Sequence, residues 1–155
     1  MKKTAFLLAA FFMYASCITA QRLMRKICAR CREEDPMVTP KTLIELGIPE
    51  SYAHKVKAYK GKGCPACGGS GTKGRIAVHE VLVMNDPVKR AILDGKAAVD
   101  IKKVAMANGM RSLRQSGLTK LAQGIVNVAE IVKTTSPDSD RPTHSAPSPT
   151  TPPQT

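Results

Sequence analysis

Two Cys-x-x-Cys pairs constrain the fold of this chain more than any other feature of its sequence. Cys28 and Cys31 form the first pair, and Cys64 and Cys67 form the second. Two cysteines at this spacing bind one metal ion from a single tight turn, and two such turns supply the four thiolates of a tetrahedral zinc site. The sequence therefore predicts one structural zinc ion. All four positions are cysteines, so no coordination position is left for a catalytic water.

Two other interpretations of these cysteines stay open. Two disulfides would form if the chain is exported to an oxidising compartment. A redox dithiol of the thioredoxin kind is less favoured, because it needs one Cys-x-x-Cys at a helix start and this chain has two pairs in predicted loops. The fifth cysteine, Cys17, has no partner in the pattern and is given no role.

Composition also favours stabilisation by a metal. The chain has 155 residues, no tryptophan and three phenylalanines, and all the phenylalanines lie within the first 20 residues. A small domain without large aromatic side chains has a weak hydrophobic core. A structural metal compensates for such a core.

The two ends differ in composition from the middle, so three regions are predicted. Residues 1–20 begin with lysines, continue with the apolar run Ala5–Met13 and end with small residues, as a secretory signal peptide does. The run is too short to span a membrane convincingly, and it would equally fit a buried strand or helix of a longer protein. Residues 21–133 are predicted to form one domain. Residues 134–155, rich in Ser, Thr and Pro, are predicted to be disordered.

Local signals in the middle region predict an α+β fold. Thr39 before Pro40, and Asn85 or Asp86 before Pro87, are helix starts. The β-branched run 75–83 predicts a strand. The predicted helices cover residues 40–46, 50–56, 87–95, 100–108, 112–123 and 128–132. The side chains expected to face the core in the longer helices are Val88, Ile92 and Leu93, then Ile101, Val104 and Ala105, then Leu113, Leu118 and Leu121. The expected architecture is a small four-cysteine zinc module with a short strand region and a C-terminal helical cluster.

The net charge of +12 lies almost entirely in this middle region. Such a basic surface suits nucleic acid, anionic lipid or an acidic protein. The sequence has neither arginine-glycine repeats nor aromatic residues interleaved with the basic ones, so nucleic acid is not predicted as a partner. A protein surface is favoured.

Other candidate chemistry is weak. The glycine cluster 68–74 lacks the order of a phosphate-binding loop and leads into a predicted strand, so it is interpreted as a turn beside the metal. Glu80 is expected to pair with Arg75 rather than to act as a general base. Three histidines share no spacing and are not predicted to be ligands: His54, His79 and His144. No catalytic or cofactor-binding residue is predicted.

A series of short motifs runs from residue 21 to residue 134. They are Gln21-Arg22-Leu23 before the first cysteine pair, Gly-x-Lys-Gly-Arg75 and Val78-His79-Glu80-Val81-Leu82 after the second, then Gly109-Met110-Arg111-Ser112-Leu113-Arg114, Gly117-Leu118, Gly124 and Ala129-Glu130-Ile131-Val132. Together they resemble the C-terminal part of the hexameric ATPases of type IV pilus assembly and type II secretion.

This resemblance implies that the four cysteines bind structural zinc and that the helices after the strand pack on a nucleotide-binding core. It also implies a cytoplasmic location beside the inner membrane, with ATPase subunits or the inner-membrane platform protein as partners. An uncut leader would add loose membrane association, and export is the alternative. In the family, the phosphate-binding loop, the acidic metal-binding residues and the histidine motif precede the region matched here, and residues 1–20 do not contain them. The chain is therefore expected not to be an enzyme by itself.

A second function stays open, that of an independent zinc-binding interaction module, exported or chaperone-like. The segment Cys64–Gly71 is similar to one Cys-x-x-Cys-x-Gly-x-Gly repeat of the DnaJ-type co-chaperones. Those proteins have four such repeats, and the first cysteine pair of this chain lacks the glycines.

Overall fold

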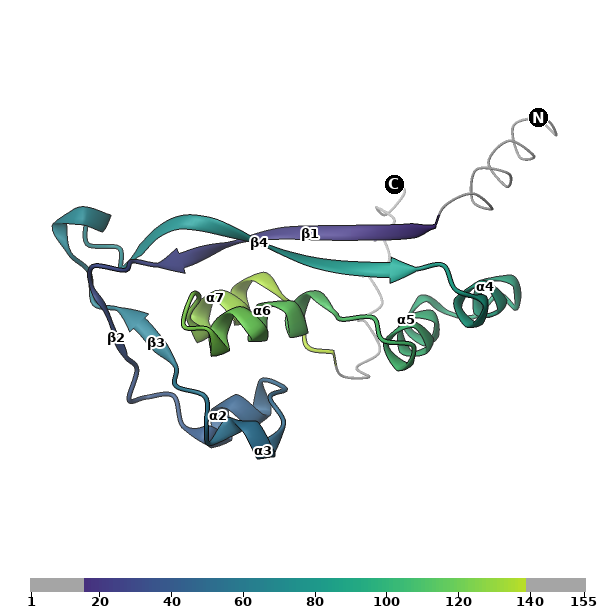
Figure 1. The fold of residues 1–155 in the computed structure, drawn as a ribbon, viewed down its shortest axis with the longest axis horizontal. Helices are drawn as coiled ribbons and strands as arrows, with labels where there is room; N and C mark the ends of the chain where they lie inside the picture. Colours follow the sequence, from purple (N-terminus) through teal and green to yellow (C-terminus); the bar gives the residue numbers. More distant parts are fainter. Residues whose placement is uncertain (1–15, 139–155) are drawn as a thin grey trace, which may run out of the picture.

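The computed structural model describes residues 16–138, and the predictions for residues 1–15 and 139–155 lie outside this range. The fold is α+β, as predicted (Figure 1). Its elements in chain order are β1 (Cys17–Ile27), β2 (Arg32–Glu34), α2 (Pro40–Glu45), α3 (Glu50–Ala53), β3 (Tyr59–Gly61), a short 3-10 helix η1 (Pro65–Cys67), β4 (Thr72–Val83), α4 (Asp86–Leu93), α5 (Ala98–Ala107), α6 (Leu113–Ala122) and α7 (Val128–Thr134).

Strands β1 and β4 form a long antiparallel ribbon. Cys17 lies opposite Val83 at one end, and Arg25 lies opposite Arg75 near the other. Helices α6 and α7 pack along one face of this ribbon (Figure 1). Strands β2 and β3 form a separate antiparallel pair, which leads to the small helices α2 and α3. The predicted strand 75–83 is confirmed within β4, whereas β1, β2 and β3 were not predicted.

The larger hydrophobic core joins one face of the ribbon to α6, α7 and the α2–α3 region. Met24 of β1 and Val78 of β4 are fully buried between α6, α7 and the α2–α3 region. The buried members of this core are Met24, Leu43, Leu46, Ile48, Ala53, Val78, Leu118, Leu121, Val126 and Ile131. A second, smaller cluster around Met84, Val88 and Ala105 packs α4 against α5. The predicted core positions of α6 therefore face the core.

The helix starts follow the capping signals of the sequence. The side chain of Thr39 accepts a hydrogen bond from the N–H of Thr42, and that of Asn85 accepts one from Val88. Ser112 and Gln115 form a reciprocal capping box at the start of α6. Each of these side chains satisfies a backbone N–H that has no partner within its helix. The predicted starts of α2 and α4 are therefore confirmed.

The predicted inward face of α4 is wrong in part. Val88 is buried, but Leu93 is 84% exposed and Ile92 is also exposed, while Ala91 is buried instead. Residues three or four apart on a helix lie on one face, so Ile92, 36% exposed, lies at the edge of the Val88 face, whereas Leu93, five positions after Val88, points away from it. Val88 and Ala91 therefore define the buried stripe, and α4 contributes only small side chains to its cluster.

Three further expectations need correction. Strand β1 begins at Cys17, so it crosses the predicted boundary between residues 20 and 21. The predicted disordered tail begins too early, because Thr135 is buried and Asp138 accepts hydrogen bonds from Lys102 and Ser112. Glu80 pairs with Lys102 at 3.6 Å and not with Arg75.

Among residues 16–138, no helix is both long enough and apolar enough to cross a membrane.

Candidate metal centre

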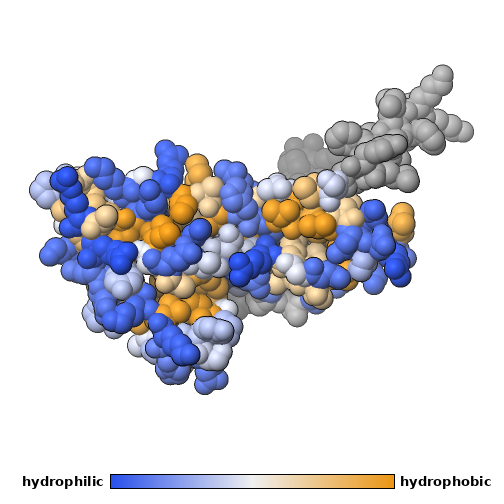
Figure 2. Space-filling view, in the orientation of Figure 1, coloured by the Kyte–Doolittle hydropathy of each residue, from blue (hydrophilic) through white to orange (hydrophobic). Residues whose placement is uncertain are grey.

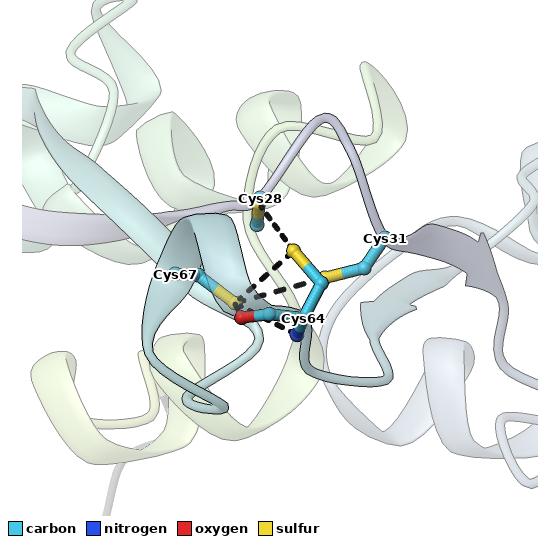
Figure 3. A group of neighbouring side chains, drawn as sticks. All are labelled: Cys28, Cys31, Cys64 and Cys67. Atoms are coloured by element: carbon cyan, nitrogen blue, oxygen red, sulfur yellow. Dashed lines mark hydrogen bonds between the residues drawn. The ribbon is translucent and has the colours of Figure 1, made fainter.

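The two cysteine pairs lie on neighbouring turns. Cys28 and Cys31 occupy the turn between β1 and β2, while Cys64 and Cys67 lie at the two ends of η1, between β3 and β4. Because β1 pairs with β4 and β2 pairs with β3, the two turns are brought together at the same end of the molecule. Figure 3 shows the four side chains pointing toward one another.

The four sulfur atoms are spaced as ligands of one metal ion. The Sγ atoms of Cys28 and Cys64 are 3.9 Å apart, as are those of Cys31 and Cys67, and the Sγ atoms of Cys64 and Cys67 are 3.7 Å apart. All four lie within 4.8 Å of one another. A tetrahedral ion bound by four thiolates at about 2.3 Å needs sulfurs about 3.8 Å apart. None of the cysteines is in a disulfide. This site can therefore hold a metal ion.

Glycines allow the two turns to approach this closely. Gly61 and Gly71 lie back to back, and a Cβ on either would overlap the carbonyl oxygen of the other. A Cβ on Gly63 would lie 2.5 Å from the carbonyl oxygen of Gly69. The N–H of Cys28 donates to the Gly71 carbonyl at 2.9 Å across this contact. The glycine cluster is thus a turn beside the cysteines, and it leads into strand β4, as predicted.

The environment of the thiols differs from one cysteine to another. Burial raises the pKa of the Cys31 thiol from 9.0 to about 12, against an opposing backbone hydrogen bond from Gly63. Burial also disfavours the thiolate of Cys67, but hydrogen bonds from the backbone of Cys64 and Gly71 lower its pKa to about 6. The pKa values of two neighbouring thiols therefore shift in opposite directions, and ionising all four thiols together is unfavourable without a cation. A bound cation favours the thiolate form of every ligand and so allows all four to be ionised.

The loop between α6 and α7 is hydrogen-bonded to the segments that flank the first cysteine pair. The N–H of Ile27 donates to the carbonyl of Ile125, in the loop between α6 and α7, at 2.8 Å. The guanidinium of Arg32 lies 4.3 Å from the ring centre of Tyr59 and donates to the carbonyl of Gly124 at 3.4 Å. No pattern in the sequence predicted this junction of Arg32, Tyr59 and Gly124. The cysteine turns, the β2–β3 pair and the α6–α7 loop are thereby held together.

The remaining sequence candidates lie elsewhere. His54 follows α3 and His79 lies in β4; both are exposed, and His144 is outside the described residues. Within residues 16–138, the four cysteines are the only group of three or more potential ligands that could hold a metal ion.

No pattern in the sequence predicted that Glu80, Lys102 and Asp138 would form an ion-pair network. The pair Ser112 and Gln115, beside that network, has the spacing of a capping box, which can be recognised in the sequence.

Comparison with known proteins points to one family. Residues 3–133 match the family described as "Type II/IV secretion system protein". The chain is 43% identical over 118 residues to the type IV pilus assembly ATPase PilB of Thermus thermophilus, an overlap of 76% of this chain and 13% of that protein. It is 36% identical over 121 residues to PilB of Myxococcus xanthus, covering 78% of this chain and 21% of the relative.

The chain is also similar to the type II secretion system protein E of Pectobacterium carotovorum. These two sequences are 32% identical over 119 residues, which is 76% of this chain and 22% of that protein. The chain therefore spans only about an eighth to a fifth of the length of these three relatives.

Proposed function

Because this chain belongs to the type II/IV secretion system protein family, we propose that it is a zinc-stabilised C-terminal domain of a type IV pilus assembly or type II secretion ATPase. Its role is structural or in protein interaction, and it is not catalytic alone. Zinc is bound by Cys28, Cys31, Cys64 and Cys67. The observation that carries this proposal is the convergence of these four sulfurs, within 4.8 Å, in a chain of this family.

In this proposal, zinc holds together the elements that meet at the cysteine end of the ribbon. The two cysteine turns connect the β1–β4 ribbon to the β2–β3 pair, and the loop between α6 and α7 is bonded to both. Four thiolate ligands leave the ion without an open position, so its contribution is to folding and not to chemistry. Structural zinc of this kind contributes on the order of 10 kcal/mol of apparent binding energy. The ion would therefore fix the geometry of the whole end of the ribbon.

The absence of independent catalysis follows from the same residues. Phosphate binding by a glycine-rich loop requires backbone N–H groups at the start of a helix and a lysine at a fixed spacing. Here the glycine cluster is followed by strand β4, and the neighbouring cysteines form a group that could hold a metal ion. ATP hydrolysis would thus need the other segments of an intact ATPase.

A cytoplasmic location fits this assignment better than export. Cleavage of a signal peptide after Ala20 would remove Cys17 to Ala20, which pair with Glu80 to Val83 in the ribbon. The family match begins at residue 3, so it includes most of the apolar leader. Four thiolates also hold zinc most securely in a reducing compartment. The partners we expect are ATPase subunits or the inner-membrane platform protein.

A chimaera tests the proposal. The 118-residue matching segment of the Thermus thermophilus ATPase is replaced by the corresponding segment of this chain. We expect the chimaera to bind zinc and hydrolyse ATP, while the present chain alone hydrolyses none. Cys28→Ser in the chimaera should abolish zinc binding and reduce hydrolysis. Cys17→Ser, at an exposed cysteine outside the cluster, is the matched control and should change neither.

Two results would contradict the proposal. Hydrolysis of ATP by the present chain alone would mean that it carries its own catalytic site. A zinc-loaded chimaera that folds but has no ATPase activity would instead favour an independent zinc-binding module.

A further inference from the structure

The ribbon has one face that the described helices leave uncovered. Helices α6 and α7 lie along one face of the ribbon (Figure 1). Val78 is in the core on that face and Ile76 packs against it, so the alternate residues of both strands lie on the opposite face. On β4 these residues are Arg75, Ala77, His79, Val81 and Val83, and their partners on β1 are Arg25, Leu23, Gln21, Thr19 and Cys17. We call this set the outer ribbon face.

One end of the outer ribbon face carries two unpaired arginines. Arg25 and Arg75 lie directly opposite each other and are both exposed. Like charges directly opposite in an antiparallel pair are destabilising. Within residues 16–138, neither guanidinium has a hydrogen-bond or ion-pair partner, and Glu130 accepts a bond only from the backbone N–H of Arg25. Such a pair is expected where an anionic group of a partner binds.

The local backbone forms a hollow around these arginines. The pairing register slips between Arg25 and Ile27, which produces a bulge at Gly74, where φ is +76°. Bulges of this kind redirect neighbouring side chains. The hollow has a volume of about 280 Å³ and is lined by Arg25, Thr72, Gly74 and Arg75. Two guanidinium groups and a hydroxyl are donors suited to a carboxylate.

The other end of the outer ribbon face carries two exposed valines. Val81 and Val83 are exposed, Val83 to 55%, and Leu23 lies between them and the arginines. A second hollow of about 360 Å³ opens beside the valines, toward α5 and the start of α6. Its other lining residues are His79, Asn85, Ala105, Asn108, Gly109, Met110, Arg111 and Ser116. Figure 2 shows apolar residues over both halves of the ribbon, including the half toward α5. The face therefore combines exposed valines at one end with two arginines at the other.

We propose that the outer ribbon face docks an acidic segment of a partner protein. An apolar side chain of the segment packs on Val81 and Val83, and a carboxylate binds Arg25 and Arg75. Residues 75 and 81 are six positions apart in a strand, so these two groups of the partner lie about 20 Å apart. This inference rests on the interaction role proposed above and specifies its surface. The face has no Phe, Tyr or Trp on which nucleic-acid bases could stack, and His79 is its one aromatic side chain.

Two-dimensional NMR with a designed peptide tests this surface. The zinc-loaded chain, labelled with ¹⁵N, is titrated with an extended peptide. The peptide contains a pair of adjacent glutamates and, six residues away from this pair, a leucine. We expect amide shifts to cluster in β1 and β4. The double variant Arg25→Gln/Arg75→Gln should weaken binding at least tenfold, and so should a peptide with glutamine in place of glutamate. Lys41→Gln/Lys55→Gln, which removes two exposed charges on the α2–α3 side, is the matched control and should bind as the unchanged chain does.

The other outcomes overturn the inference. They are equal weakening by the lysine control, shifts centred away from β1 and β4, and displacement of the peptide by single-stranded DNA or phosphatidylglycerol vesicles. A zinc-loaded chain that does not bind the peptide also refutes the docking surface, while leaving the proposed function intact. Failure of the unchanged chain to bind zinc counts against the proposed function instead.

Discussion

Replacing Gly61 by Ala should separate the two cysteine turns. The backbone of Gly61 is not in the left-handed region, so alanine is tolerated there in an isolated chain. In the folded protein its Cβ would overlap the carbonyl of Gly71, and the two segments must move apart by about 1 Å. Metal–ligand distances tolerate only about 0.2 Å of error, so we expect zinc affinity to fall by at least about 100-fold.

The control for this variant is Gly69→Ala, in the same glycine cluster. A Cβ on Gly69 meets no atom within 4 Å, but φ is +77°. Its cost is therefore conformational only, about 1–2 kcal/mol, which corresponds to roughly a tenfold effect. Zinc affinity is measured by competition with a chromogenic chelator, and unfolding by circular dichroism. Equal affinities for the two variants would refute the idea that close backbone contact assembles the site.

Three further substitutions test the packing and the electrostatics. Ile131→Ala, at a fully buried side chain, should lower the free energy of unfolding by about 2–5 kcal/mol, whereas Val132→Ala, at a neighbour that is 58% exposed, should change it by less than about 0.5 kcal/mol. Arg75→Glu places opposite charges across the ribbon and should raise the unfolding free energy by about 0.2–1 kcal/mol; a loss of stability would contradict the like-charge argument. Asp138→Asn weakens the bond from the buried Ser112 hydroxyl and should cost about 1 kcal/mol in denaturant unfolding, and no change would mean that residues after α7 do not stabilise the domain.

Much of the helical structure could be predicted because its signals are local. Thr39, Asn85 and Ser112 each precede a helix and cap it with their own side chain. The convergence of the four cysteines was also predictable, since their spacing favours two turns that share one site. In both cases the information lies within a few neighbouring residues.

Strand β1 could not be predicted in the same way. Its segment from Gln21 to Lys26 contains four polar or charged residues and no β-branched ones, so neither propensity nor alternation marks a strand. It is a strand because it pairs with β4 along ten positions, from Cys17 opposite Val83 to Ile27 opposite Thr72. The back-to-back glycines, Gly61 and Gly71, depend on the same long-range pairing. Only the folded chain shows that they meet.

The most direct test of the central claim is the metal content of the purified chain. The protein is prepared under reducing conditions and examined by elemental analysis and zinc X-ray absorption. We predict one zinc ion per chain, coordinated by four sulfurs at about 2.3 Å, and its loss in Cys28→Ser but not in Cys17→Ser. A metal-free, folded chain whose four cysteines are joined in two disulfides would contradict the account.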